Sequence, residues 1–311
     1  MSLRFTIARK GLLGNSRSLL VYAGSDCRTA TYRNQLFSVF LDKVSPSRVR
    51  YAVVDALGGS SGIIDANCES HQGTPAVFVF NGSLCILASG TPADGPTPGA
   101  RPVLATYDPS RNAFQSETFR FGFHGTPSLV EYGSRLYLFF RAGPGQPLRW
   151  ASTEDLKVWS DPQPVLRDGD DPVIPRQDPV ACVYQGLIHL FHDLPDGLAQ
   201  IRFDGASGWS RSRTFIARAF QTSPAVVVHD GLLTLACVRP AGRDLDTDLH
   251  LYRYDGNALG LVDVSFALQA VGPAAAGVLN GTLYIFYPAP DEESSTSSTS
   301  SASGQGDEHA R

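Results

Sequence analysis

A pattern that recurs along most of the chain limits its fold more than any other feature. In each copy a proline precedes a short apolar run, a turn containing Gly or Asn, and a second apolar or aromatic run. Two apolar runs joined by such a turn are typical of a β-hairpin. Five copies read GTPAVFVFNGSLCILAS from Gly73, GTPSLVEYGSRLYLFFRA from Gly125, QDPVACVYQGLIHLFHDL from Gln177, TSPAVVVHDGLLTLACVRP from Thr222 and VGPAAAGVLNGTLYIFYPA from Val271. A sixth, which lacks the proline, reads RTATYRNQLFSVFLD from Arg28.

The spacing of the copies predicts the architecture. The prolines stand at positions 75, 127, 179, 224 and 273, so successive copies lie 52, 52, 45 and 49 residues apart. This interval fits one four-stranded blade of a β-propeller. More polar stretches between the hairpins, such as 101–107 and 114–121, supply two outer strands for each blade. We therefore expect an all-β fold, a six-bladed β-propeller.

The two ends of the chain complement each other in this arrangement. The last hairpin, which ends near Tyr287, has no outer strands after it, whereas apolar segments at 3–8 and 18–23 precede the first hairpin. We expect these N-terminal strands to complete the C-terminal half-blade, because closure removes an open sheet edge. The alternative is a five-bladed ring with a loose N-terminal extension. In the six-bladed arrangement residues 1–290 form the propeller, and the Ser-, Thr- and Glu-rich residues 291–311 form a disordered tail.

Composition narrows the classes of partner. The formal net charge is −4 and no stretch concentrates Lys or Arg, which argues against nucleic acid and against an anionic membrane surface. No window approaches the ~18 apolar residues of a membrane span, and the N-terminus carries no secretory signal pattern. We therefore expect a cytoplasmic protein whose five cysteines are small buried apolar residues.

Two of the repeat copies resemble a known group of propellers. GTPSLVEYGSRLYLFFRA and TSPAVVVHDGLLTLACV resemble the Ser-Pro-Ala and Gly-x-Leu-Tyr repeats of the tachylectin-like propeller lectins of bacteria and fungi. The resemblance covers roughly residues 28–288 and concerns mainly scaffold positions. It implies the propeller fold and names carbohydrate binding as one function. Function depends on the site rather than on the scaffold, so the resemblance concerns mainly the fold.

A second resemblance is local. Ser152-Thr-Glu-Asp155-Leu-Lys-Val-Trp159 resembles the Ser-x-Asp-Leu-x-x-Trp segment of arabinanase- and invertase-type propeller glycosidases, and also the Asp-box of sialidases. Asp178-Pro-Val resembles the Asp-Pro motif on the inner strands of the same glycosidases. Glu154 replaces the usual Asp and Leu156 the usual Gly. The resemblance implies that this segment staples a blade turn.

The candidate site lies at one mouth of the central channel. Residues just before the first strand of each hairpin, and just after its second strand, gather there. These residues are polar and differ from blade to blade, which favours one central site over a site repeated in every blade. The expected proton-transfer residues are His71, His124 and Asp178. The expected substrate-binding residues are Arg141, Gln177, His192, Asp193, Gln221, Arg239 and Tyr287, with Gln72, Arg28 and Arg176 at further mouth positions.

From these residues we expect one small polar or anionic organic molecule, or a sugar, to bind at the channel mouth. The chain would act on it as a cofactor-independent cyclase, isomerase or lyase, through acid–base and electrostatic catalysis. The alternative is a carbohydrate-binding lectin, which is opposed by the supply of only three tryptophans, Trp150, Trp159 and Trp209. Glycoside hydrolysis, which usually needs two facing carboxylates, and a protein-interaction propeller are less favoured.

Neither a cofactor nor a metal is implied. The sequence contains no Gly-rich phosphate loop, nucleophile elbow or dinucleotide fingerprint. Its histidines lack the HxH or HExxH spacing of metal ligands, and the acidic stretches 168–171 and 244–248 lack the full pattern of a calcium loop.

Overall fold

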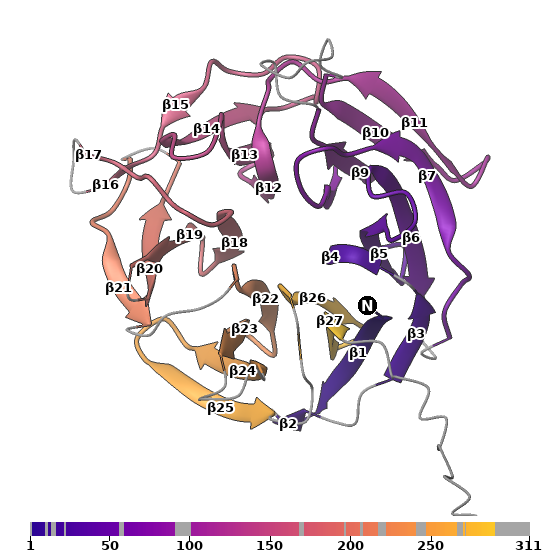
Figure 1. The fold of residues 1–311 in the computed structure, drawn as a ribbon. Coiled ribbons are helices and arrows are strands. Elements are labelled where there is room, and N and C mark those ends of the chain that lie inside the picture. The colour runs from indigo at the N-terminus through magenta and orange to yellow at the C-terminus, as the bar shows by residue number, and fades with distance from the viewer. Residues whose placement is uncertain are drawn as a thin grey trace, which may run out of the picture.

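Six antiparallel sheets of four or five strands surround a central axis in the computed structural model (Figure 1). The sheets form a six-bladed β-propeller, as the repeat spacing predicted. No helix among the described residues is long and apolar enough to cross a membrane. The structure describes residues 2–9, 12–13, 17–21, 23–55, 59–90, 101–167, 171–195, 197–205, 208–216, 222–240, 247–265, 270 and 272–289. The tail predicted over 291–311 lies outside these residues.

Each blade pairs its strands in order, from the innermost at the axis to the outermost at the rim (Figure 1). Blade 1 contains β4 (Ala23–Tyr32), β5 (Gln35–Asp42), β6 (Arg48–Val54) and β7 (Ile64–Glu69). Blade 2 contains β8 (Ala76–Phe80), β9 (Ser83–Ala88), β10 (Val103–Asp108) and β11 (Ala113–Thr118). Blade 3 contains β12 (His124–Tyr132), β13 (Arg135–Arg141), β14 (Leu148–Thr153) and β15 (Gln163–Pro164), followed by a short ribbon of β16 (Leu166–Arg167) and β17 (Asp171–Pro172).

The remaining blades follow the same plan. Blade 4 contains β18 (Val180–Tyr184), β19 (Leu187–Leu194), β20 (Gly197–Phe203) and β21 (Arg213–Ile216). Blade 5 contains β22 (Ala225–His229), β23 (Leu232–Pro240), β24 (Thr247–Tyr254) and β25 (Leu259–Ser265). Blade 6 contains β26 (Ala275–Leu279), β27 (Thr282–Ala289), β1 (Ser2–Arg9), β2 (Leu12–Leu13) and β3 (Arg17–Val21).

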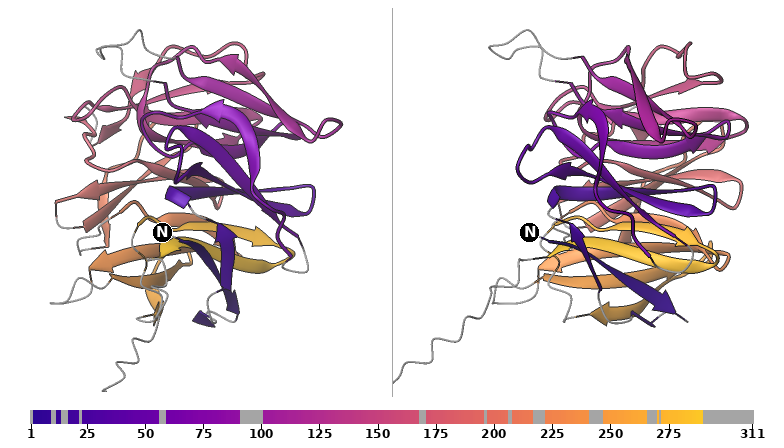
Figure 2. Two further views of the ribbon diagram at one scale, coloured as in Figure 1. Left: turned by 45° about the vertical axis from the view of Figure 1, so that its right-hand side comes forward. Right: turned by 90° about the vertical axis from the view of Figure 1, so that its right-hand side faces the viewer.

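Blade 6 closes the ring with strands from both ends of the chain. Strand β1 pairs antiparallel with β27 from Ser2 opposite Ala289 to Ala8 opposite Leu283, and β3 pairs with the other edge of β1. Figure 2 shows β1 alongside the C-terminal hairpin in both views. The side chains of Leu3 and Phe5 are buried in the core between blades 6 and 1. The predicted closure by N-terminal strands is therefore confirmed, and the five-bladed alternative is wrong.

The apolar core is divided among the blade interfaces. Six clusters of buried side chains lie between the six pairs of neighbouring blades, and each draws on both blades of its pair. This arrangement explains the near-continuous apolar runs of the inner hairpins, because both faces of each blade are covered by a neighbour. All five cysteines are buried, and none of them forms a disulfide bond. Burial raises the pKa of the Cys182 thiol to about 12, which makes this thiol unreactive at neutral pH.

The innermost hairpins share one type of turn. Both central residues of the turn have positive φ in blades 1 to 6, namely Arg33 and Asn34, Asn81 and Gly82, Gly133 and Ser134, Gln185 and Gly186, Asp230 and Gly231, and Asn280 and Gly281. Turns with two positive φ values match the twist of the flanking strands and favour Asn followed by Gly. Blade 3 departs from this preference, because Ser134 adopts a φ of 63° where four other blades have glycine.

This difference between blades gives a reciprocal stability prediction. Ser134→Gly is expected to raise the free energy of unfolding by about 1 kcal/mol, since a non-glycine residue in the left-handed region costs roughly that much. The reverse change in blade 2, Gly82→Ser, is expected to lower it by a similar amount, because Gly82 has a φ of 71° and open space around it. Urea unfolding of both variants provides the measurement. Shifts of the same sign would contradict the turn account.

The segment from Ser152 to Trp159 forms a turn that is fixed by its own hydrogen bonds, as its resemblance to the propeller glycosidase segment implied. The Oδ1 atom of Asp155 accepts hydrogen bonds from the backbone N–H groups of Lys157 and Val158, both at 2.8 Å. The indole N–H of Trp159 donates to the carbonyl oxygen of Leu156 at 2.9 Å. Leu156 has a φ of 67°, which explains why glycine usually stands at this position.

Candidate functional site

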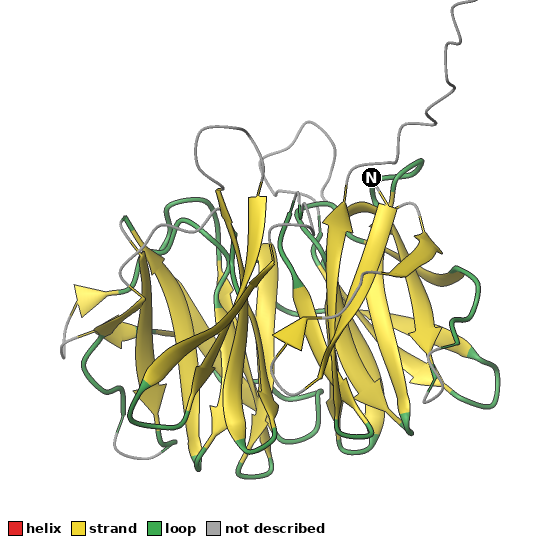
Figure 3. Ribbon diagram, turned by 90° about the horizontal axis from the view of Figure 1, so that it is seen from below, coloured by secondary structure: helices red, strands yellow, loops and turns green. Residues whose placement is uncertain are grey.

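Three of the predicted site residues meet where blades 3 and 4 reach one face of the ring. The strands run between the two faces, and loops connect them at both (Figure 3). We call the face at which the innermost strands begin the mouth face. His124, the first residue of β12, lies directly opposite Arg141, the last residue of β13. Arg141 in turn contacts Asp178, which precedes β18. The ring thus gathers His124, Arg141 and Asp178, although 54 residues separate the first from the last in the sequence.

His124 is held by a residue from the neighbouring blade. Its Nδ1 atom lies 2.7 Å from the Oε1 atom of Gln72. The amide of Gln72 donates from Nε2 to the carbonyl oxygen of Gly90 at 3.0 Å, so that Oε1 faces the imidazole as an acceptor. Nδ1 of His124 must therefore carry the hydrogen, which leaves a lone pair on Nε2 of the neutral ring. A half-buried histidine with a fixed tautomer is suited to accept a proton at Nε2.

Gln72 itself is fixed by a small serine cluster. Its backbone N–H donates to Oγ of Ser89 at 2.8 Å, and Ser89 lies 2.9 Å from Oγ of Ser70. Ser70 and Ser89 are both buried. The orientation of His124 therefore depends on contacts in blade 2 as well as in its own blade.

The Arg141–Asp178 ion pair joins blades 3 and 4. Arg141 donates from one terminal nitrogen to Oδ1 of Asp178 at 2.6 Å, and from the other to the carbonyl oxygen of Arg176 at 3.1 Å. Oδ2 of Asp178 accepts the backbone N–H of Thr126 at 2.9 Å. Both carboxylate oxygens are thus hydrogen-bonded to the protein. The carboxylate therefore holds Arg141 and the backbone of Thr126 in place, and its expected part in proton transfer remains a prediction.

Gly125 makes the close approach of the two blades possible. It has a φ of 74°, and a Cβ atom at this position would lie 2.1 Å from Oδ1 of Asp178. Any side chain there would push Asp178 away from Arg141. Gly73 has a similar role one blade earlier, because its Cβ would lie 2.9 Å from the backbone of Gly125. Both glycines begin a Gly-Thr-Pro sequence, which explains why blades 2 and 3 share these three residues.

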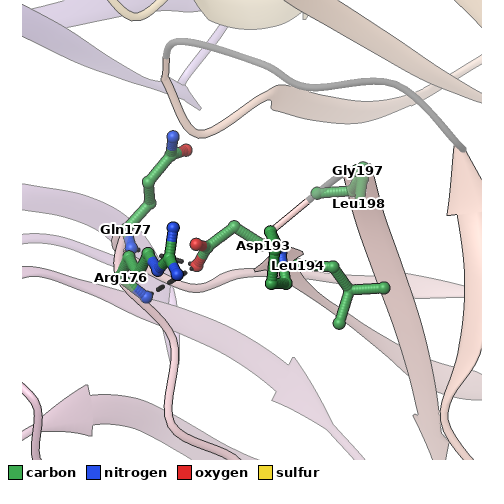
Figure 4. Close-up of a pocket in the computed structure, with 7 residues that line it drawn as sticks. Arg176, Gln177, Asp193, Leu194, Gly197 and Leu198 are labelled. Carbon is green, nitrogen blue, oxygen red and sulfur yellow. Dashed lines mark hydrogen bonds between the residues drawn. The ribbon is translucent and has the colours of Figure 1, made fainter.

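Asp193 organises a second hollow on blade 4. Its Oδ1 atom accepts the backbone N–H groups of Arg176 and Gln177 at 2.9 and 3.0 Å, as Figure 4 shows. Together with Leu194, Pro195, Gly197 and Leu198, these residues line a cavity of about 110 Å³. The carboxylate of Asp193 therefore holds the segment that leads into β18. Arg176 is exposed at the edge of this cavity.

A larger cavity lies on the axis of the ring. It has a volume of about 180 Å³ and is lined by residues that lie in, or directly before, the innermost strands of all six blades. Pro127, three residues after His124, and Pro179, which follows Asp178, both belong to its wall. Two members of the cluster, His124 and Asp178, are thus close in sequence to residues of the cavity wall.

The structure does not bring every predicted residue to the mouth. Tyr287 is fully buried between blades 5 and 6, so the prediction that it contacts a ligand is wrong. His192 is also buried, with Nδ1 at 3.1 Å from the carbonyl oxygen of Asp193, and burial lowers the pKa of its imidazole. The ring of His71 lies 3.4 Å from the carboxylate of Glu69 at the end of β7. The contacts described for these three side chains are with residues other than His124, Arg141 and Asp178.

Two further predicted residues are not placed by the structure. Gln221 lies outside the described residues, and for Arg239 only the backbone in β23 is described. Their expected contacts with a ligand remain predictions. Among the side chains that are placed, no group of three His, Cys, Asp or Glu is arranged to hold a metal ion.

The three tryptophans pack inside the blades. Trp159 is buried, Trp209 stacks on Phe203 with ring centroids 4.6 Å apart, and Trp150 lies 5.9 Å from Tyr137. Each indole therefore belongs to the core or its margin. This placement provides no set of exposed tryptophan faces of the kind that a sugar repeated in every blade would need.

Comparison with known proteins supports the fold. No protein-family model matches this sequence, and no curated protein matches it. A mutant of AofleA from Arthrobotrys oligospora is 12% identical and matches with a TM-score of 0.57 over 92% of this chain and 83% of that chain. The GH43 β-xylosidase/α-arabinofuranosidase CoXyl43 from a compost microbial metagenome, in complex with xylotriose, is also 12% identical. It has a TM-score of 0.53 over 80% of this chain and 96% of that chain.

A third similar structure is a mutant sialidase of Trypanosoma rangeli. It is 11% identical, with a TM-score of 0.53 over 88% of this chain and 55% of that chain. Several of the similar structures are thus glycosidase propellers, the class that the local resemblance around Trp159 suggested. At these identities the likeness shows the fold alone.

Proposed function

We propose that this propeller binds one small polar or anionic organic molecule at its mouth face, and that His124 accepts a proton from it. The observation that carries the proposal is the hydrogen bond between His124 Nδ1 and Gln72 Oε1, which leaves Nε2 of the half-buried imidazole with its lone pair. An imidazole is the side chain best suited to such a role near neutral pH.

The chemistry is a proton transfer that needs no cofactor. Nε2 of His124 takes a proton from a C–H group next to a carbonyl of the ligand, and the electron pair of that bond moves into the carbonyl. Return of the proton from His124 to a neighbouring atom completes an isomerisation in which atoms and charges balance. Gln72 is the positioning residue, because it fixes the tautomer throughout.

A sugar or a related hydroxylated compound fits this site as well as other polar molecules. Similar structures include enzymes of sugar chemistry, one of them in complex with xylotriose. Glycoside hydrolysis is not favoured, because each predicted carboxylate already serves the scaffold. Asp178 binds Arg141 and Thr126, and Asp193 binds the backbone of residues 176–177.

Solvent-exchange measurements test the role of His124. The intact protein is incubated in D₂O with a panel of small keto and hydroxy acids and aldose sugars, and deuterium uptake at carbon is followed by NMR. The wild-type chain is expected to label one class of compound, and His124→Gln to slow this labelling by about 10²- to 10⁴-fold, the usual contribution of a general base. His71→Gln is expected to leave the rate unchanged. Equal rates in the wild type and His124→Gln would contradict the proposal.

The positioning role of Gln72 has a separate readout. Gln72→Glu keeps an acceptor for Nδ1 but places a negative charge beside the imidazole, which favours its protonated form. The acidic limb of the pH–rate profile is therefore expected to move to higher pH in this variant. An unshifted profile would show that Gln72 does not act through His124.

A further inference from the structure

The wall of the axial cavity consists of equivalent positions from all six blades. The turns of the innermost hairpins mark these positions, because each turn begins at a residue with positive φ. Five residues before each turn stand Arg28, Ala76, Ser128, Val180, Ala225 and Ala275, and all six line the cavity. The residues that follow them, Thr29, Val77, Leu129, Ala181, Val226 and Ala276, form a second ring in the same wall.

Arg28 differs in kind from the other members of its ring. Five blades place a small or aliphatic uncharged residue at this level, whereas blade 1 places an arginine. Among the described residues that line the cavity there is no Asp, Glu, Lys or His, and Arg28 alone is charged. None of the described carboxylates forms an ion pair with it.

The direction of the Arg28 side chain follows from its neighbour. Thr29 donates from Oγ1 to the carbonyl oxygen of Ala276 at 2.7 Å and therefore faces blade 6. Because successive side chains of a strand point to opposite sides, Arg28 faces blade 2, where Ala76 and Val77 leave room. One guanidinium N–H bonds to the carbonyl oxygen of Cys27 at 2.9 Å. Other guanidinium N–H groups remain for a ligand.

A half-buried guanidinium without a carboxylate partner favours a bound anion. Removing a charge from water costs free energy unless a counter-charge compensates it. The rest of the wall offers few other hydrogen-bond donors for an anion, since Pro127, Pro179 and Pro224 have no backbone N–H. The planar fork of arginine matches the two oxygens of a carboxylate.

We propose that Arg28 binds the carboxylate of a small organic acid inside the axial cavity. The volume of about 180 Å³ suits a short acid rather than an oligosaccharide, as one liquid water occupies ~30 Å³. The inference rests on the proposed function only for the identity of the ligand: it makes the compound that His124 deprotonates an organic acid. The anion site itself does not depend on catalysis.

Acetate is the probe for this site. Titration of the full chain with ¹³C-labelled acetate, followed by NMR or calorimetry, is expected to show one saturable site. Arg28→Gln is expected to weaken binding by about 10- to 100-fold, the range of a charge-assisted contact. Arg111→Gln, at an arginine in an exposed turn of blade 2, is the matched control and is expected to bind acetate normally. Equal affinity in the wild type and Arg28→Gln, or no saturable site in the wild type, would overturn the inference.

The near-sixfold ring allows a stronger test. In the double variant Arg28→Ala/Val180→Arg the guanidinium returns to the same level of the cavity from blade 4. Acetate binding lost in Arg28→Ala is expected to return in the double variant. If the double variant folds but does not bind acetate, the proposal that a guanidinium at this level of the cavity is enough to bind a carboxylate is overturned. Chloride that competes as well as acetate at equal concentration would overturn the assignment to a carboxylate.

The outcomes separate this inference from the proposed function. His124→Gln is expected to bind acetate with unchanged affinity. Normal acetate binding together with unchanged deuterium exchange in His124→Gln contradicts the proposed function and leaves the anion site standing. If acetate does not bind but deuterium exchange still depends on His124, the anion site is contradicted and the proposed function stands.

Discussion

A chain that lacks residues 1–9 is expected to lose its cooperative unfolding transition, because the missing segment is the strand that joins the two ends of the ring. Strand β1 lies between β27 and β3 and pairs with β27 over seven residue pairs. Without it, β27 becomes an open edge and the core beneath Leu3 and Phe5 is exposed to water. Urea unfolding followed by circular dichroism measures the effect, and a synthetic peptide of residues 1–9 is expected to restore the transition in trans.

Two further variants make this prediction specific. Phe5→Ala, which removes one buried ring of β1, is expected to cost about 3–5 kcal/mol of unfolding free energy. Removal of residues 291–311 is expected to leave the midpoint unchanged, because the sequence predicts a tail that does not pack. If the chain without residues 1–9 unfolds as cooperatively as the wild type, the closure of the ring by β1 has no energetic importance.

Loss of the Asp178 carboxylate is expected to destabilise the contact between blades 3 and 4. Asp178→Ala leaves the Arg141 guanidinium, only 7% exposed, without its counter-charge and removes the acceptor of the Thr126 N–H. Breaking a buried pair from one side typically costs about 3–5 kcal/mol. Because Asp178 is 22% exposed, we expect a value near 3 kcal/mol in chemical denaturation.

A double-mutant cycle and an exposed pair serve as controls. Arg141→Leu/Asp178→Ala is expected to cost less than the sum of the two single changes, because the double variant leaves no unpaired charge. The exposed Arg120–Asp161 pair, with side chains 58% and 82% exposed, is the matched comparison. Asp161→Ala is expected to cost less than about 1 kcal/mol. Additive effects at Arg141 and Asp178 would contradict the description of a coupled interblade pair.

The sequence was sufficient to predict the architecture because each blade repeats a local pattern. The repeated apolar runs gave six hairpins, five of them preceded by a proline, and the apolar segments at 3–8 and 18–23 indicated how the ring closes. The first of these segments became β1 and the second overlaps β3. The short ribbon of β16 and β17 was not predicted, because strands of two residues carry no apolar periodicity.

The site was predicted only in part, because it depends on contacts between blades. His124, Arg141 and Asp178 were expected at one mouth, and the structure brings them together. The pairing of His124 with Gln72 was missed. The two residues occupy equivalent positions of neighbouring repeats, 52 residues apart, but the repeat does not show which side chains touch between blades. The repeated Gly-Thr-Pro sequence was an available signal, as it marks the place where Gly73 and Gly125 bring neighbouring blades into contact. Tyr287 was misplaced because strand alternation turns its ring into the core.

We propose one binding site at the mouth of a repeating scaffold, and the number of ligands bound per chain distinguishes it from a site in every blade. Native mass spectrometry of the intact chain, titrated with the organic acid that shows deuterium exchange, counts bound molecules. The proposed site predicts saturation at one molecule per chain, with binding weakened at least tenfold in Arg28→Gln, the loss typical of one charge-assisted contact. Several equivalent molecules per chain, bound equally well by the wild type and Arg28→Gln, would contradict the single-site account.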